Sequence, residues 1–167
     1  MKTTVSTLKR NSIIVVLFFL SISVLKAQEY SQALSSMNVT EAQKIQSLVE
    51  ELQPSLYVKQ ASIEQFGDQS SRVVFCEISS LERLYELNQE YQTVEIIRIS
   101  VSNPSELSYS MDFKNLESFA SLKYIYIVFQ YDVCGGLSQS CIAGYANAMI
   151  QNISPKVKLL YKLDIVE

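Results

Sequence analysis

The stretches VEIIRISV (residues 94–101) and LKYIYIVF (residues 122–129) contain the pattern that decides the fold of this chain. Both are rich in β-branched and aromatic residues, which favour strands. Their apolar positions repeat with one spacing after 28 residues: Val94, Ile97 and Ile99, then Leu122, Ile125 and Ile127. Successive side chains on a strand point to opposite faces. Each stretch therefore predicts a strand that carries apolar side chains on both of its faces.

Further strand-like runs alternate with helical patterns on either side of these two stretches. With them, the expected strands cover residues 73–78, 94–101, 123–131 and 157–164. The first connecting helix is expected over residues 79–91, where Ser79 and Glu82 match a capping box. Strands that alternate with helices predict an α/β fold. We expect a mainly parallel sheet of about four strands, joined by right-handed crossovers.

A helix and a short hairpin are expected before this sheet. The helix follows Thr40, its expected N-cap, and ends before Pro54. Its apolar residues fall at helical spacing and form one stripe: Ile45, Leu48, Val49 and Leu52. Short alternating runs in residues 55–74, together with the turn signal Gly67-Asp68, then predict one or two short strands.

The shared spacing L-x-x-L-x-L resembles a degenerate leucine-rich repeat, in which each unit adds one strand to a stack. Leu116, Phe119 and Leu122 approach the second unit at intervals of three, as the turn before such a strand does. The asparagine position of the repeat is occupied by Ser102 and Gln130 instead. The chain also resembles small secreted bacterial envelope proteins of unassigned function. This resemblance implies a repeat-like stack of βα units and no particular chemistry.

The first 27 residues match a signal peptide. Lys2, Lys9 and Arg10 form a positive region, and the apolar stretch 12–25 follows with 14 residues, fewer than the roughly 20 of a membrane span. Cleavage after Ala27 is expected, and a membrane anchor is the alternative. We therefore predict export to the periplasm or beyond, with no stable membrane span afterwards. Residues 28–37 are expected to be a flexible N-terminus, and residues 38–167 a single α/β domain.

Composition excludes several functional classes for one chain. Without residues 1–27, ten basic and 17 acidic residues remain, so the net charge is −7 and a nucleic-acid partner is not expected. The chain has no histidine, so it cannot form a Cys–His zinc site or a histidine-dependent catalytic triad. No spacing matches a calcium loop or a phosphate-binding glycine loop. We expect no metal, no cofactor and no enzymatic activity.

Three cysteines have different expected roles. Cys134 and Cys141 flank Gly135-Gly136, where the backbone can turn sharply, and an exported protein meets an oxidising environment. We predict a disulfide between them, and two free thiols are the alternative. Cys76 lies inside an apolar strand and is expected to be a small core residue.

One strand face combines aromatic and charged residues. If Ile125, Ile127 and Phe129 face the core, then Tyr124 and Tyr126 face the other way. Arg98 on the neighbouring strand shares that second face. Tyrosine and arginine are enriched at interaction surfaces, so these three residues are the candidate binding residues. The alternative is that the N-terminal helix covers this face and buries them.

The sequence leaves three functional hypotheses open. The first is an exported, non-catalytic module that recognises a protein or peptide through one sheet face. The second is a hydrolase that uses only carboxylates, such as a glycosidase-type acid pair. The third is a purely structural component of an envelope. Neither the partner nor the oligomeric state can be named from the residues.

Overall fold

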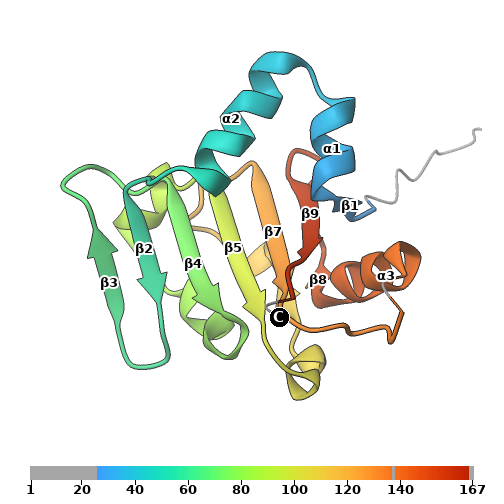
Figure 1. Ribbon diagram of the computed structural model, residues 1–167. Coiled ribbons are helices and arrows are strands. Elements are labelled where there is room, and N and C mark those ends of the chain that lie inside the picture. Colours follow the sequence, from blue (N-terminus) through green and yellow to red (C-terminus); the bar gives the residue numbers. More distant parts are fainter. Residues whose placement is uncertain (1–25, 137, 166–167) are drawn as a thin grey trace, which may run out of the picture.

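The computed structural model describes residues 26–136 and 138–165, and one mixed sheet organises them (Figure 1). Seven strands form this sheet in the order β1-β9-β7-β5-β4-β2-β3. Their bounds are β1 Gln28–Glu29, β2 Ser55–Val58, β3 Ile63–Phe66, β4 Val73–Glu77, β5 Ile96–Val101, β7 Tyr124–Phe129 and β9 Lys158–Leu163. Only the hairpin pair β2–β3 is antiparallel, and every other pair is parallel. The predicted signal peptide, apart from Lys26 and Ala27, lies outside the described residues.

The remaining elements connect the strands or precede them. The α-helices are α1 Tyr30–Ser36, α2 Val39–Glu50 and α3 Gln139–Met149, and the 3-10 helices are η1 Ile78–Tyr85, η2 Gln89–Thr93, η3 Pro104–Ser108 and η4 Phe113–Asn115. Two short strands, β6 (Met111–Asp112) and β8 (Ile150–Gln151), pair in parallel outside the main sheet. The predicted α/β class and mainly parallel sheet are confirmed.

The predicted number of about four strands is wrong, because the sheet extends at both ends. The expected hairpin is present as β2 and β3, and β2 joins the sheet by pairing in parallel with β4. At the other end, β1 pairs with β9. A strand of two residues is too short to show an alternating pattern, so the sequence does not reveal β1.

Residues 28–36 form β1 and α1, which corrects the expectation of a flexible N-terminus. The Glu29 carboxylate accepts a hydrogen bond from the Gln32 backbone N–H and caps α1. Tyr30 and Ala33 are buried on the sheet, where the Tyr30 ring lies 5.2 Å from the ring of Tyr126. This burial of an aromatic ring orders a segment whose other residues are mostly polar.

The predicted helix after residue 37 is confirmed as α2, but its cap differs. Asn38, not Thr40, is the N-cap, and its side-chain oxygen accepts from the Glu41 backbone N–H at 2.9 Å. Asparagine caps a helix at least as well as threonine, so both choices were compatible with the sequence. Ile45 and Leu48 are buried as the apolar stripe predicts. Leu52 is exposed beyond the helix end.

The connection after β4 consists of η1 and η2 instead of one α-helix over residues 79–91. Its buried residues Ile78, Leu81 and Leu84 are spaced by three, which matches the 3.0 residues per turn of a 3-10 helix. Leu87, which an α-helical stripe would bury, is 84% exposed. The predicted capping box does not form, because the N-cap is Glu77 and it makes no side-chain capping bond.

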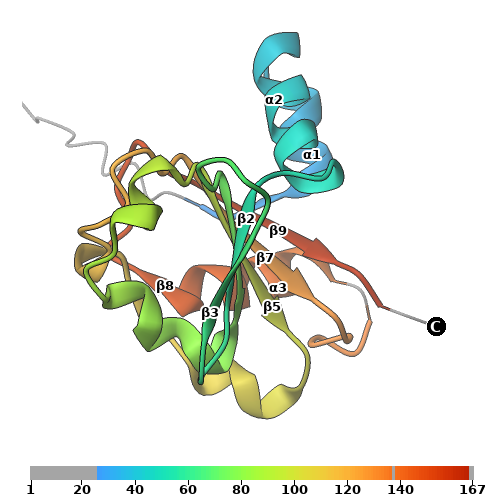
Figure 2. The same ribbon diagram turned by 90° about the vertical axis from the view of Figure 1, so that its left-hand side faces the viewer.

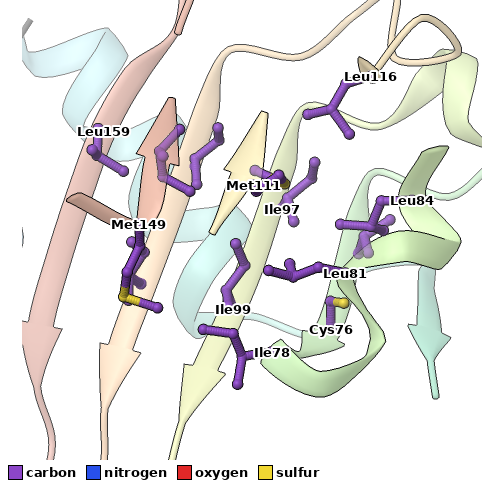
Figure 3. Close-up of a cluster of buried hydrophobic side chains, with 14 of the residues drawn as sticks. Cys76, Ile78, Leu81, Leu84, Ile97, Ile99, Met111, Leu116, Met149 and Leu159 are labelled. Carbon is purple, nitrogen blue, oxygen red and sulfur yellow. The ribbon is translucent and has the colours of Figure 1, made fainter. Parts of the chain in front are cut away.

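Two apolar clusters lie on opposite faces of the sheet. The larger one packs the strands against their connecting segments, and Figure 3 shows Ile97 and Ile99 of β5 among Leu81, Leu84 and Met111. The smaller one packs α1 and α2 on the other face (Figure 2). All six residues of β7 are buried, since both of its faces are covered.

The predicted disulfide between Cys134 and Cys141 is confirmed. The Asp132 carboxylate accepts from the backbone N–H groups of Cys134 and Gly135, and Gly135 has a φ of 66°. The bridge thus closes a turn that only glycine enters easily and ties it to the start of α3. It is compatible with the oxidising compartment expected of an exported protein.

Cys76 is free and buried, as predicted. Burial and, secondarily, the nearby Glu77 raise the pKa of its thiol to about 12, so little reactive thiolate forms at neutral pH.

Thiol alkylation of the native, unreduced protein should therefore modify no cysteine quickly. Prior reduction should add two labels, at Cys134 and Cys141, and Cys76 should react only in denaturant. Intact-mass measurement counts the labels, and peptide mapping locates them. Rapid labelling of Cys134 without reductant would contradict the disulfide.

Candidate binding face of the sheet

The parallel register places one residue from each of five neighbouring strands in a single row. This row runs from β2 through β4, β5 and β7 to β9 and consists of Tyr57, Phe75, Arg98, Tyr126 and Leu160. All five side chains lie on the face that the smaller cluster occupies, because residues at matching positions of a parallel pair share a face. The three predicted binding residues therefore lie on this face, with Tyr124 one row nearer the strand starts.

The helices α1 and α2 cover the β7 part of this face (Figure 2). Tyr124 is 4% exposed and Tyr126 is 1% exposed. Tyr124 donates a hydrogen bond to Glu41 of α2 at 3.3 Å, and Tyr126 packs against Tyr30 of α1. Burial is the main cause that raises the pKa of each phenol to about 12. The helix-covered alternative thus describes both tyrosines, which are core residues and not accessible anchors.

The β2–β5 part of the face holds an aromatic pair beside Arg98. Tyr57, 39% exposed, stacks on half-buried Phe75 with ring centroids 4.9 Å apart and an angle of 11° between the rings. A small pocket of ≈ 90 Å³ adjoins this pair. Its lining consists of Tyr57, Val58, Lys59, Phe75, Cys76, Glu77 and Ser100. We call Tyr57, Phe75, Arg98 and Ser100 the open face.

Arg98 is held in place by rings and not by a charge. Its guanidinium carbon lies 5.7 Å from the ring centroids of both Phe75 and Tyr126. Two such cation–π contacts orient the half-buried side chain. None of the ion pairs among residues 26–136 and 138–165 includes Arg98. The guanidinium therefore keeps its charge and its hydrogen-bonding edge for another group.

Sequence reasoning found Arg98 but missed Tyr57 and Phe75. Each stands at an alternate position of its strand, beside residues that are buried on the opposite face. That alternation could have identified them as residues of the second face. Their position beside Arg98 depends on the pairing of β2 with β4 and of β4 with β5, which local spacing does not contain.

Comparisons with protein-family models, with curated proteins and with solved structures found no match. Within the described residues, no helix has the length and apolar character needed to cross a membrane. The same part of the chain contains no group of three or more histidine, cysteine or acidic residues arranged to hold a metal ion.

Proposed function

We propose that this chain is an exported, non-catalytic binding module that recognises a protein or peptide through the open face. The observation that carries the proposal is the position of Arg98, which is oriented by two aromatic rings and has no carboxylate partner in the described structure. Arginine and tyrosine dominate interface hot spots, because they bury large areas around directed polar groups. The expected partner segment is acidic, since a carboxylate matches the planar donor edge of a guanidinium.

The proposed repeat construction has support from the order of the strands. Along the chain, β2, β4, β5, β7 and β9 each take the next position in the sheet. A leucine-rich repeat adds one strand per unit in the same stepwise way. A face built by this stacking presents one side chain from each unit in a row, which suits an extended partner segment.

The carboxylate-hydrolase hypothesis has less support. Hydrogen bonds lower the pKa of each described carboxylate whose shift is resolved, and they outweigh burial where burial opposes them: Glu29, Glu41, Glu64, Glu95 and Asp112. A glycosidase-type general acid requires a raised pKa so that it holds its proton near neutral pH. We therefore favour binding over acid-pair catalysis.

The binding proposal is tested by selecting peptides from a random display library on the exported protein. Enriched peptides should contain an acidic residue. Arg98→Ala should weaken the binding of such a peptide roughly tenfold, because a charge-assisted hydrogen bond contributes about 1.5–3 kcal/mol. Tyr57→Ala should also weaken binding, through lost contact area. Fluorescence anisotropy with the labelled peptide measures both effects.

Lys114→Ala is the matched control, because Lys114 is an exposed cation in η4, on the segment that connects β5 to β7. It should leave the affinity unchanged, and all three variants should keep the melting temperature of the parent within a few degrees. Failure to enrich any peptide would count against the proposal. Equal effects of Arg98→Ala and Lys114→Ala would also reject the open face as the binding surface.

A further inference from the structure

A basic ledge lies where the parallel strands begin, apart from the open face. Two pockets of ≈ 500 Å³ and ≈ 410 Å³ adjoin there and share Ser121 and Lys123. Five of the ten basic residues beyond residue 27 line these pockets: Lys44, Arg72, Lys123, Lys156 and Lys158. We call these five residues the basic ledge. Arg72, Lys123 and Lys158 stand at the first residue of a strand or directly before it, and Lys156 stands in the turn before β9. Parallel pairing of the strands therefore brings these four residues to the same edge of the sheet.

Glu95 organises the larger pocket. Its carboxylate pairs with Lys44, with Lys123 at 2.8 Å and with Arg72 at 2.8 Å, and its side chain is 13% exposed. Burial acts to raise the pKa of Glu95, but hydrogen bonds from the three cations outweigh it and lower the pKa to about 2. One carboxylate thus meets three cations, which leaves two positive charges in excess.

The smaller pocket adds further positive charge. Lys158 pairs with Glu41 at 2.6 Å, and Lys156 has no ion pair within the described structure. Glu41 and Glu95 are the two carboxylates that line the pockets, against five cations. The local charge of +3 contrasts with the −7 of the chain beyond residue 27. Such a local excess attracts anions even to an acidic protein.

We propose that the two pockets form one binding site for a ligand that carries two neighbouring phosphate groups. Each pocket has an excess of cations, and Lys123 lies in both, so one phosphate would occupy each pocket with Lys123 between them. Lysine ammonium groups have three donors, and phosphate oxygens accept several charge-assisted bonds at once. Ser70 and Ser121 line the larger pocket with hydroxyl groups that can donate as well.

The two pockets differ in polarity, which fits a ligand with an organic part. Ala120, Leu122 and Tyr124 contribute apolar atoms to the smaller pocket, whereas the larger one is lined by polar and charged side chains. A lipid headgroup with two phosphates and a soluble diphosphate share the charged part. The membrane-bound and soluble sources are separated by experiment.

Isothermal titration calorimetry with pyrophosphate and orthophosphate, at low ionic strength, tests the site on the exported protein. Pyrophosphate should bind at least about tenfold more tightly than orthophosphate, because only pyrophosphate spans both pockets. Lys123→Gln and Lys156→Gln should each weaken pyrophosphate binding roughly tenfold. Added salt should weaken it further, since salt screens exposed charges.

Lys114→Gln is the control, because it removes the same charge from an exposed position that lines neither pocket. It should change the affinity by less than about twofold, as expected of an exposed, screened charge outside both pockets. Lys156→Gln breaks no ion pair of the described structure and should fold normally, which thermal unfolding verifies. Absence of pyrophosphate binding would overturn the proposal. An equal loss in Lys114→Gln would also overturn it, because net charge would then explain the effect.

Cosedimentation with vesicles identifies the source of the phosphates. Phosphatidylcholine vesicles with cardiolipin present paired phosphates, and pure phosphatidylcholine vesicles are the control. The protein could sediment with the cardiolipin vesicles but not with the pure phosphatidylcholine vesicles, and pyrophosphate could reverse this sedimentation. That result would assign the site to a lipid headgroup. Pyrophosphate binding without sedimentation would assign it to a soluble ligand. Both results are independent of the peptide-binding test, because Arg98→Ala changes the open face and leaves the basic ledge intact.

Discussion

Tyr126→Ala should lower the free energy of unfolding by about 3–4 kcal/mol, the range seen when a large buried aromatic is truncated. Tyr126 belongs to β7 and is 1% exposed, and its ring packs against the ring of Tyr30 in α1. Removal of its ring leaves a cavity under α1, which partial collapse of the helix cannot fill. Urea unfolding followed by circular dichroism measures the change.

Tyr57→Ala is the matched control, because Tyr57 stands in the same row of the sheet but at its accessible end. It should cost less than about 1 kcal/mol, as expected of a partly exposed residue outside the core. Tyr126→Phe should also cost little, since it keeps the ring that fills the space. A loss below about 1 kcal/mol for Tyr126→Ala would contradict the helix cover and make Tyr126 a surface candidate again.

Glu95→Gln should lower the free energy of unfolding by about 2 kcal/mol near pH 7, because it leaves three cations without their shared carboxylate. The folded pKa is about 2, below the ordinary value of 4.5. A depressed carboxyl pKa contributes stability that is present above the unfolded pKa and is lost as the pH falls through the folded pKa. The expected loss in the free energy of unfolding is smaller than the whole pKa shift would give, because Lys44 and Lys123 are partly exposed and solvent screens their charges.

The pH dependence distinguishes this effect from a simple loss of packing. The difference between wild type and Glu95→Gln should be complete above about pH 5 and should shrink as the pH falls toward 2. Glu82→Gln is the control, because Glu82 is exposed and belongs to no ion pair of the described residues. Urea midpoints over this range measure both variants. A difference that persisted unchanged at the acidic end would mean that ionisation of Glu95 is not its source.

Local patterns in the sequence were sufficient to predict the four strands β4, β5, β7 and β9. The spacing of Val94, Ile97 and Ile99 and its repeat at Leu122 identify β5 and β7, since period-2 alternation reports burial on the faces of a strand. The disulfide also followed from local features, because the two cysteines flank a glycine turn. The spacing of three residues between Ile78, Leu81 and Leu84 was also visible in the sequence. It was interpreted as part of an α-helix, so the 3-10 helix η1 was not predicted.

Only the tertiary structure decided which residues of the second face are accessible. Alternation assigned Tyr126 and Arg98 to one face, but Tyr30 covers Tyr126 from a helix 96 positions earlier in the chain. The row from Tyr57 to Arg98 requires the registers of two strand pairs, and the basic ledge requires β4, β7 and β9 to begin at one edge. These arrangements join residues far apart in sequence. Their energies come from contacts that exist only after the strands have paired, so local spacing determined the elements while packing determined the candidate sites.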